Sequence, residues 1–158
     1  MEDFTDSDLS ADVDTSRSTF GYMMTYAGGS ISWQSRLQKS VSLSTTEVEY
    51  MAAVEAGKEV IWMKDFIGDL GIRQKEFRLH YDSQSVIHIA KKAAYHSINK
   101  HMQRRYHWIR ERVEDKDFAL SKIHTEENGS DMLTKVLSTE KLDVCRRRIG
   151  IGSHPMLE

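Results

Sequence analysis

Short runs in which apolar and polar residues alternate predict the strands of this chain. Residues 19–26, TFGYMMTY, are aromatic and β-prone, and the pair Gly28-Gly29 separates them from SISWQS. Two such runs around a glycine pair predict a β-hairpin. FRLHYD at 77–82 alternates apolar and polar residues, which predicts a half-buried strand, and FALSKIH at 118–124 predicts a last strand. A short strand is predicted before the hairpin, over Phe4 to Asp6.

Longer segments repeat apolar residues at helical spacing. The first predicted helix runs from about Thr45 to Leu70, with Ser44 or Thr45 as its N-cap and Gly71 as its stop. A short helix is predicted after Asp82, and a longer one over 97–114. A further helix is predicted to begin at SDMLTK. The last helix is predicted over 139–149, with Leu142, Cys145 and Ile149 on one apolar stripe. Strands that alternate with helices after an initial hairpin predict an α/β fold, in which helices pack on a mixed sheet.

Size and composition fit a single soluble domain. The chain has 158 residues, with 39% hydrophobic and 29% charged residues, and we expect one domain over 1–150 and a tail over 151–158. Leu157-Glu158 is typical of a cloning remnant. Cys145 is the single cysteine, so an internal disulfide and a multi-cysteine zinc site are excluded. We expect no membrane segment and a cytoplasmic or nuclear location.

Glu49 is an acidic residue on the apolar stripe of the first predicted helix. At 100° per residue, the stripe residues fall within about 40° of one line, and they are Glu49, Ala53, Ala56, Val60, Met63 and Ile67. Glu47 lies on the far side and is interpreted as a surface residue. Burying a lone carboxylate is costly, so a metal ion or a nearby cation is one explanation for Glu49. The alternative is a solvated residue that favours the positive end of the helix.

Asp6, Asp82 and Asp131 are predicted at strand ends or helix starts, where ligands bind in open α/β sheets. We take none of them to have a lysine partner four residues away. With Glu49 they form a candidate site of oxygen ligands, which hard cations such as Mg²⁺ prefer. Two such ions about 4 Å apart stabilise both oxygens of an in-line phosphoryl displacement.

Basic and polar side chains near these elements are candidates for phosphate contacts. On the helix over 97–114, a basic flank with an aromatic residue could follow a nucleic-acid backbone, although a solvated charged face is the alternative. Other candidates lie in the segments DTSRST and SWQSRLQKS, which could equally be ordinary turns. Ser83 and Gln84 are candidates because they come directly after Asp82. The predicted nucleic-acid-binding residues are Arg17, Ser18, Arg36, Lys39, Ser83, Gln84, His101, Arg105, Trp108 and Arg112.

Five collinear segments carry a resemblance to a known family. They are DSDLSADVDTSRSTFGY, ISWQSRLQKSVSLSTTEVEYMAAVEAGKEVIWM, HYDSQSVIHIAK, HSINKHMQRRYHWIRERV and KIHTEENGSDMLTKVLSTEKL. Over about residues 4–150 the chain resembles the ribonuclease H domain that ends the polyprotein of copia-type LTR retrotransposons, with the plant branch the closest. The resemblance implies a ribonuclease H-like mixed five-stranded sheet with helices on both faces.

The resemblance also implies cleavage of the RNA strand of RNA–DNA hybrids with two Mg²⁺ ions, for which Mn²⁺ can substitute. Carried across residue by residue, the metal ligands and catalytic residues are Asp6, Glu49, Asp82 and Asp131. Related enzymes carry a mobile histidine near this site, so His124 is a further catalytic candidate, although a surface histidine is the alternative reading.

Partners follow from the same resemblance: an RNA–DNA hybrid and other polyprotein segments such as reverse transcriptase. If the element is active, the expected location is a virus-like particle. We expect a monomer, with a strand-exchange dimer as the alternative because a short first strand leaves an opening in the sheet. Gln103 and Gly129 depart from the family pattern, and Gly129 is expected to loosen the turn before Asp131. The alternative function is therefore a catalytically weak, domesticated module that binds nucleic acid or a protein.

Overall fold

A mixed five-stranded sheet forms the centre of the molecule. The computed structural model describes residues 1–12, 17–38, 44–82 and 100–152, without the side chains of residues 10–12 and 100–102. The strands have the spatial order β3-β2-β1-β4-β5. β2 is antiparallel to both of its neighbours, β1 and β3, whereas β1, β4 and β5 are parallel. Their bounds are β1 Glu2–Asp12, β2 Arg17–Tyr26, β3 Gly29–Leu37, β4 Arg78–Tyr81 and β5 Ala119–Lys122.

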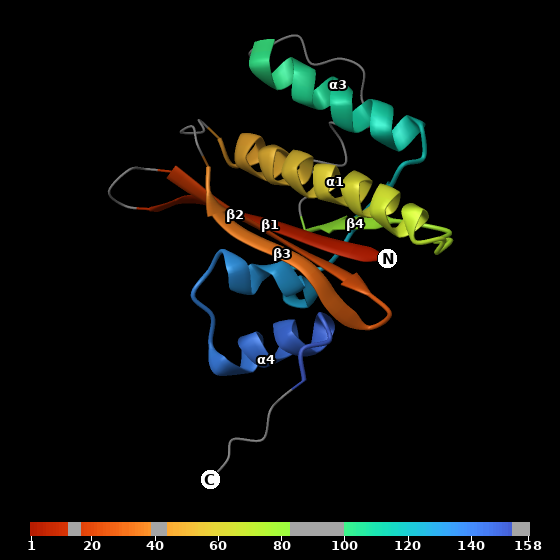
Figure 1. Ribbon diagram of the computed structural model, residues 1–158. Helices are drawn as coiled ribbons and strands as arrows, with labels where there is room; N and C mark the ends of the chain where they lie inside the picture. The colour runs from red at the N-terminus through yellow and green to blue at the C-terminus, as the bar shows by residue number, and fades with distance from the viewer. Residues whose placement is uncertain (13–16, 39–43, 83–99, 153–158) are drawn as a thin grey trace.

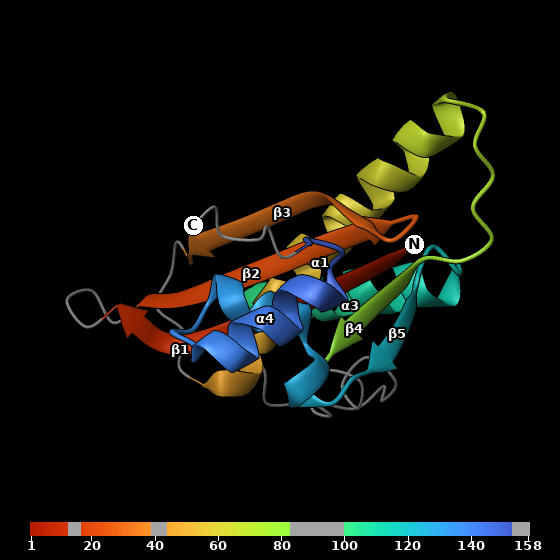
Figure 2. The ribbon, with the colours of Figure 1, turned by 90° about the horizontal axis from the view of Figure 1, so that it is seen from below.

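Helices cover both faces of this sheet, as predicted. Figures 1 and 2 show α1 on one face with α3 outside it, and α4 with the short turns that precede it on the other face. The fold class predicted from the sequence is therefore confirmed. The bounds are α1 Thr45–Asp69, α3 Lys100–Glu114 and α4 Thr139–Arg148, with 3₁₀ turns η1 Thr125–Glu127 and η2 Gly129–Leu133.

β1 is longer than predicted. It has 11 residues and pairs along β2 from Glu2 to Asp12, and its first residues also pair in parallel with β4. Asp6 therefore lies in the middle of a central strand and not at the end of a short one. The predicted strand-exchange dimer rested on a short β1, and that premise is wrong. Aspartate is depleted in strands, which is why the polar sequence of β1 hid its length.

The predicted hairpin forms, but its turn is shifted by one residue. The two residues between β2 and β3 are Ala27, with φ of 50°, and Gly28, with φ of 85°. Positive φ at both central residues is typical of a type I′ turn, whose twist matches that of the flanking strands. Gly29 is already part of β3.

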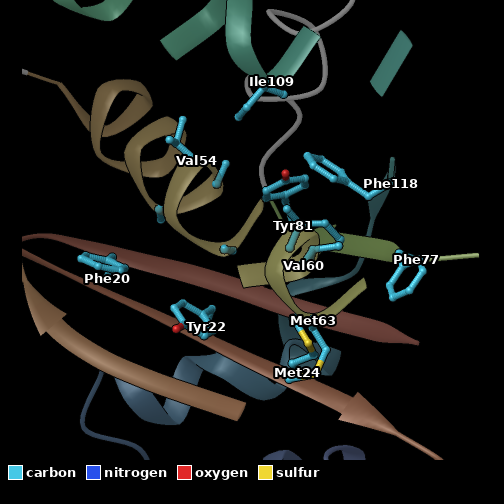
Figure 3. Close-up of a cluster of buried hydrophobic side chains, with 14 of the residues drawn as sticks. Phe20, Tyr22, Met24, Val54, Val60, Met63, Phe77, Tyr81, Ile109 and Phe118 are labelled. Atoms are coloured by element: carbon cyan, nitrogen blue, oxygen red, sulfur yellow. The ribbon is translucent and has the colours of Figure 1, made fainter. Parts of the chain in front are cut away.

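α1 buries the predicted stripe against the sheet. Ala53, Ala56, Val60, Met63 and Ile67 are all buried and belong to the larger hydrophobic core. Figure 3 shows side chains of α1 between the sheet and Ile109 of α3, with Phe118, which directly precedes β5, beside them. The predicted ends are also confirmed, since the Ser44 side chain accepts a hydrogen bond from the backbone N–H of Glu47, and Gly71 has φ of 73°.

A smaller core fills the opposite face. Phe4, Met23, Ile123 and Ile149 form it, with α4 above them. Cys145 and Ile149 are buried as predicted, whereas Leu142 is 38% exposed, so the predicted α4 stripe is wrong at that position.

Two further predictions concern short helical segments. SDMLTK was expected to begin a helix, but it lies mainly in the 3₁₀ turn η2. The short helix predicted after Asp82 lies outside the described residues. None of the helices in the described part of the chain is long and apolar enough to cross a membrane.

Candidate metal centre

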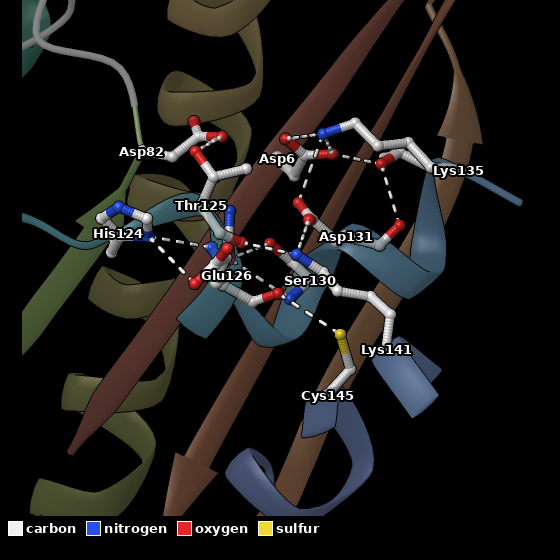
Figure 4. Close-up of polar contacts among 12 residues, drawn as sticks. Asp6, Asp82, His124, Thr125, Glu126, Ser130, Asp131, Lys135, Lys141 and Cys145 are labelled. Atoms are coloured by element: carbon white, nitrogen blue, oxygen red, sulfur yellow. Dashed lines mark hydrogen bonds and ion pairs between the residues drawn. The ribbon is translucent and has the colours of Figure 1, made fainter. Parts of the chain in front are cut away.

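Three aspartates from separate elements converge beside the centre of the sheet. Asp6 lies within β1, Asp82 directly follows β4, and Asp131 lies in η2. One carboxylate oxygen of each residue lies within 4.8 Å of those of the other two. Figure 4 shows the three side chains directed toward one another. The predicted convergence of these aspartates is therefore observed.

A glycine on β2 lets η2 approach the sheet. Gly21 is the β2 partner of Asp6 in the antiparallel register. A Cβ at position 21 would lie 2.6 Å from the Leu133 Cβ and 3.2 Å from the Thr134 Cγ2. The lack of a side chain at Gly21 is thus what allows η2 to lie against β2, with Asp131 next to Asp6.

Asn128 fixes the start of η2 on β1. Its Nδ2 donates a 3.1 Å hydrogen bond to the Thr5 carbonyl, and its Oδ1 accepts from the Ser130 backbone N–H and hydroxyl at 3.3 and 2.7 Å. Asn128 is fully buried, so these bonds are made in a low-dielectric setting. We expected Gly129 to loosen this turn, but the neighbouring residues anchor it directly to the sheet.

Glu49 reaches the same place from α1. It is half-buried and lines a small pocket together with Asp6 and Asp82. It is not one of the three residues whose oxygens lie within 4.8 Å of one another. The structure therefore brings Glu49 to the site, at its edge rather than inside the aspartate cluster.

Burial raises the pKa of Asp6 to about 6. A hydrogen bond from the Thr134 hydroxyl and the nearby Lys135 ammonium act in the opposite direction, while Asp131 adds to the rise. Burial alone would lower the pKa of Lys135, yet Asp6 and Asp131 raise it, so the ammonium stays charged. Desolvation is the dominant effect on Asp6, which explains why its pKa rises beside a cation.

Two lysines contact the aspartates, and the sequence reasoning missed both. Lys135 Nζ lies 3.0 Å from an oxygen of Asp6 and 3.3 Å from one of Asp131. Lys141 Nζ lies 3.2 Å from the second oxygen of Asp131. The expectation that no carboxylate had a lysine partner four residues away is wrong, since Lys135 follows Asp131 at that spacing. Pairs at this spacing are neighbours in helical turns, so the signal was present in the sequence.

The donor set fits a divalent cation. Asp6, Asp82 and Asp131 offer carboxylate oxygens from three sides, and hard cations such as Mg²⁺ take oxygen ligands. Asp6 and Asp131 are 5% and 2% exposed, so their negative charges are poorly screened by water. These residues could hold a metal ion, with Glu49 next to it.

His124 does not contact the aspartates. Its side chain is 73% exposed, and its Nδ1 accepts a 3.4 Å hydrogen bond from the Glu126 backbone N–H at the start of η1. The residue beside the cluster is instead Thr125, whose hydroxyl lies 3.5 Å from an oxygen of Asp82. The catalytic role predicted for His124 thus stays a prediction, without a contact in this structure to support it.

Two of the predicted nucleic-acid-binding residues share a pocket. Arg36 of β3 and Arg105 of α3 line a pocket of about 290 Å³, together with Met51 and Glu55 of α1. Arg17, at the start of β2, is exposed. Arg36 and Arg105 lie on the side of the sheet covered by α1, near the first turns that also carry Glu49.

Other predicted contact residues have structural positions instead. Ser18 is fully buried, which removes its side chain from any surface that a nucleic acid could touch. Trp108 packs against the larger core close to Gly57. Arg112 pairs with Asp115 and Asp117 at 3.5 and 3.0 Å. Lys39, Ser83 and Gln84, and the side chain of His101, lie outside the described part of the structure.

Solved structures share this architecture. LC11-RNase H1 in complex with an RNA/DNA hybrid matches with a TM-score of 0.61 and 16% identity, covering 84% of this chain and 92% of that one. RNase H1 from Halobacterium salinarum matches with a TM-score of 0.57 and 18% identity, covering 90% and 96%. The chain therefore has the ribonuclease H fold.

Sequence comparison adds a closer relationship. The chain is 49% identical over 154 residues to the retrovirus-related Pol polyprotein from transposon TNT 1-94 of Nicotiana tabacum, and 31% identical over 153 residues to that from transposon RE2 of Arabidopsis thaliana. The matches cover 98% and 96% of this chain, but it spans only 12% and 10% of those polyproteins. No protein-family model matches. The chain is thus a homologue of a segment of plant-transposon Pol polyproteins, which confirms the resemblance found in the motifs.

Proposed function

We propose that this chain is a metal-dependent endoribonuclease that hydrolyses the RNA strand of RNA–DNA hybrids. The observation that carries the proposal is the convergence of Asp6, Asp82 and Asp131 within 4.8 Å, with Glu49 beside them. The fold supports it, because a structure with this fold was solved in complex with an RNA/DNA hybrid. The relatives support it as well, since they are Pol polyproteins.

The aspartates would hold Mg²⁺, or Mn²⁺ in its place. Bound metal ions supply activation of the attacking water and stabilisation of the leaving oxygen. Water adds to the phosphorus, the bond from phosphorus to the 3′ oxygen breaks, and the products are a 5′-phosphate and a 3′-hydroxyl. Asp6 and Asp131 provide buried negative charge for cation binding, while Asp82, which is only half-buried, lies on the side open to the substrate.

Arg36 and Arg105 would contact the phosphates of the bound hybrid. They line one pocket on the side of α1, and positive groups along the path of a nucleic acid supply most of its non-specific affinity. Arg17, which is exposed at the start of β2, is a further proposed phosphate contact. Other polyprotein segments, such as reverse transcriptase, are proposed partners because the chain spans a small part of its relatives.

One observation favours the alternative of a catalytically weak binding module. Lys135 and Lys141 make ion pairs with Asp6 and Asp131, and these pairs oppose the binding of a metal ion to the same oxygens. The arginine pocket would serve nucleic-acid binding without hydrolysis. The two functions differ in whether substrate is cleaved.

The test is cleavage of end-labelled substrates by the purified chain. We expect fragments from the RNA strand of a hybrid in the presence of Mg²⁺, none after chelation with EDTA, and none from double-stranded DNA or double-stranded RNA. Binding of the hybrid without any cleavage, in Mg²⁺ or Mn²⁺, would establish the alternative instead. Cleavage that persists in EDTA would contradict metal dependence.

A further inference from the structure

Lys135 inserts its ammonium between two of the three clustered aspartates. The Lys135 Nζ lies 3.1 and 3.0 Å from the two oxygens of Asp6, and 3.3 Å from the Asp131 Oδ1. Figure 4 shows these contacts as a bridge across the site. The oxygens that Lys135 contacts belong to residues that also form the candidate metal site. A divalent cation bound by Asp6 and Asp131 would therefore meet an ammonium at the same carboxylates.

The backbone holds Lys135 in this position. The backbone N–H of Lys135 donates a 3.0 Å hydrogen bond to the Asp131 carbonyl, which places the two side chains on one side of the turn. The Lys135 side chain is 32% exposed, whereas those of Asp6 and Asp131 are each 3% exposed. The ammonium thus enters the cluster from a partly exposed side chain, which a phosphate in solvent could contact.

We infer that Lys135 is an internal cation that competes with Mg²⁺ for Asp6 and Asp131, and that a phosphate of bound nucleic acid draws it away. This inference rests on the proposed function. An ammonium and a divalent cation repel strongly at contact distance in a site that water screens poorly. The flexible stem of lysine lets the ammonium leave the carboxylates without unfolding the turn.

Competition of this kind links metal binding to substrate binding. Without nucleic acid, the ion pairs of Lys135 lower the apparent affinity for Mg²⁺. A phosphodiester at the mouth of the site offers the ammonium another anionic partner, so the aspartates become available. By reciprocity, Mg²⁺ and nucleic acid then strengthen the binding of each other, in addition to any direct contact between ion and phosphate.

The first test is titration calorimetry of Mg²⁺ into the chain without nucleic acid. We expect Lys135→Met to bind Mg²⁺ about tenfold more tightly than the wild type, because it removes a partly buried ion pair. Lys122→Met is the matched control, since it removes an equal charge at the end of β5, next to Tyr81 in the strand register. The ion pairs of the aspartates in the described part of the chain are made by Lys135 and Lys141 instead. We expect the control to change the affinity less than about twofold.

The second test repeats the titration with an uncleavable hybrid whose RNA strand is 2′-O-methylated. The hybrid should tighten Mg²⁺ binding more in the wild type than in Lys135→Met, in which the competing charge is already gone. Because the titration measures Mg²⁺ binding directly, it separates competition by Lys135 from a purely structural role of this residue. Circular dichroism spectra of Lys135→Met and Lys122→Met check that both variants are folded.

Three outcomes would overturn the inference: equal Mg²⁺ affinity in Lys135→Met and the wild type, an equal gain in Lys122→Met, or equal coupling to the hybrid in both forms. Asp82→Asn separates this failure from failure of the proposed function. Loss of Mg²⁺ binding in Asp82→Asn without a gain in Lys135→Met would refute the competition alone. Wild-type Mg²⁺ binding by Asp82→Asn would refute the metal site itself, and the inference with it.

Discussion

Asp3 is a fully buried carboxyl group that lies apart from the metal centre. Within the described structure, neither of its side-chain oxygens has a hydrogen-bond partner of good geometry. Burial raises the pKa of Asp3 well above its ordinary value, and Glu59 on α1 adds to this, while the Phe4 N–H acts against it. Tyr22 and Tyr81 are its other ionisable neighbours. Asp3 therefore favours its neutral form in the folded chain.

We predict that the free energy of unfolding of Asp3→Asn, relative to that of the wild type, increases as the pH rises. The folded-state pKa of Asp3 is above that of the unfolded chain, so its favourable contribution is fully present below about pH 4 and declines as the pH rises toward the folded-state value. The variant has no such decline. Urea unfolding midpoints at pH 4, 6 and 8 measure the difference, and a difference that is the same at each pH would contradict the assignment.

Glu47 and Glu49 give a matched pair of isosteric changes. Glu49 lines the pocket with Asp6 and Asp82, whereas Glu47 belongs to the first turn of α1, where its backbone is bound by the N-cap. We predict that Glu49→Gln lowers the rate of hybrid cleavage at least about tenfold, the usual scale for a group that acts on reacting atoms, and that Glu47→Gln lowers it less than about twofold. Single-turnover rates measure both, and equal losses would sink the assignment of Glu49.

For single residues, the sequence predicted which side chains belong to the site better than it predicted which side chains contact them. Helical spacing separated Glu49, which lines the pocket, from Glu47, which does not, because helical periodicity is local information. The expected surface position of Glu47 is not confirmed, since Glu47 is half-buried like Glu49. Lys135 was missed although it follows Asp131 at a spacing that predicts contact. Lys141 could not be found in this way, since its contact with Asp131 depends on how α4 packs on η2.

The turn η2 positions Asp131, and its approach to the sheet depends on Gly21. A Cβ at Gly21 would overlap the side chain of Leu133, so η2 must shift in a Gly21→Ala variant. We predict a destabilisation of roughly 1–3 kcal/mol, as for other overpacked sites, and weaker Mg²⁺ binding because Asp131 moves away from Asp6. Gly29→Ala is the control, since nothing lies within 4 Å of a Cβ at that position. Equal stability and equal Mg²⁺ affinity in the two variants would contradict this account of η2.

Asp117 joins the ends of three elements. It lies just before β5 and accepts hydrogen bonds from Lys64 of α1 at 2.7 Å and Arg112 of α3 at 3.0 Å. The hydrogen bond from Lys64 lowers the pKa of Asp117 below its ordinary value, with Arg112 adding to the effect. These contacts tie α3 to the layer that covers the sheet.

We predict that Asp117→Asn destabilises the fold by roughly 1 kcal/mol at pH 7, the scale of a partly exposed ion pair. Because the folded-state pKa is lowered, this stabilisation is present above the unfolded value near 4 and is lost as the pH falls below it. Urea unfolding at pH 7 and pH 3 should show the difference between variant and wild type shrink at pH 3. A larger difference at pH 3 would contradict the ion-pair account.

Helices and strands with periodic apolar residues were predicted well. Elements whose extent depends on contacts with distant parts of the chain were not. α1 and β4 have clear patterns and matched their predicted ranges within a few residues. β1 is rich in aspartate, and only its position between β2 and β4 shows why it extends over 11 residues. η2 is short and irregular, and its place depends on Asn128 and Gly21, which lie far apart in the sequence.

At the scale of the whole molecule, the sheet assembles one site from distant parts of the chain. β1, β4 and the turns η1 and η2 with their caps bring together residues that are 43 to 128 positions apart, as the contacts of Asp82 with Thr125 and of Asp6 with Thr134 show. The order of elements predicted the fold class, and the family motifs supplied the resemblance. The predicted nucleic-acid-binding residues stay a prediction: Ser18 is buried and Arg112 is ion-paired in the folded chain, and neither property can be read from a linear sequence.

The measurement that tests the central claim most directly compares Asp82→Asn with the wild type in hybrid cleavage and in Mg²⁺ binding. Asp82 is half-buried at the end of β4, and the change to Asn removes a ligand charge with almost no change in shape. We predict a loss of cleavage of at least about a hundredfold together with weaker Mg²⁺ binding, at an unfolding midpoint equal to that of the wild type. Cleavage at the wild-type rate by a folded Asp82→Asn variant would contradict the assignment of the aspartate cluster as the metal-dependent active site.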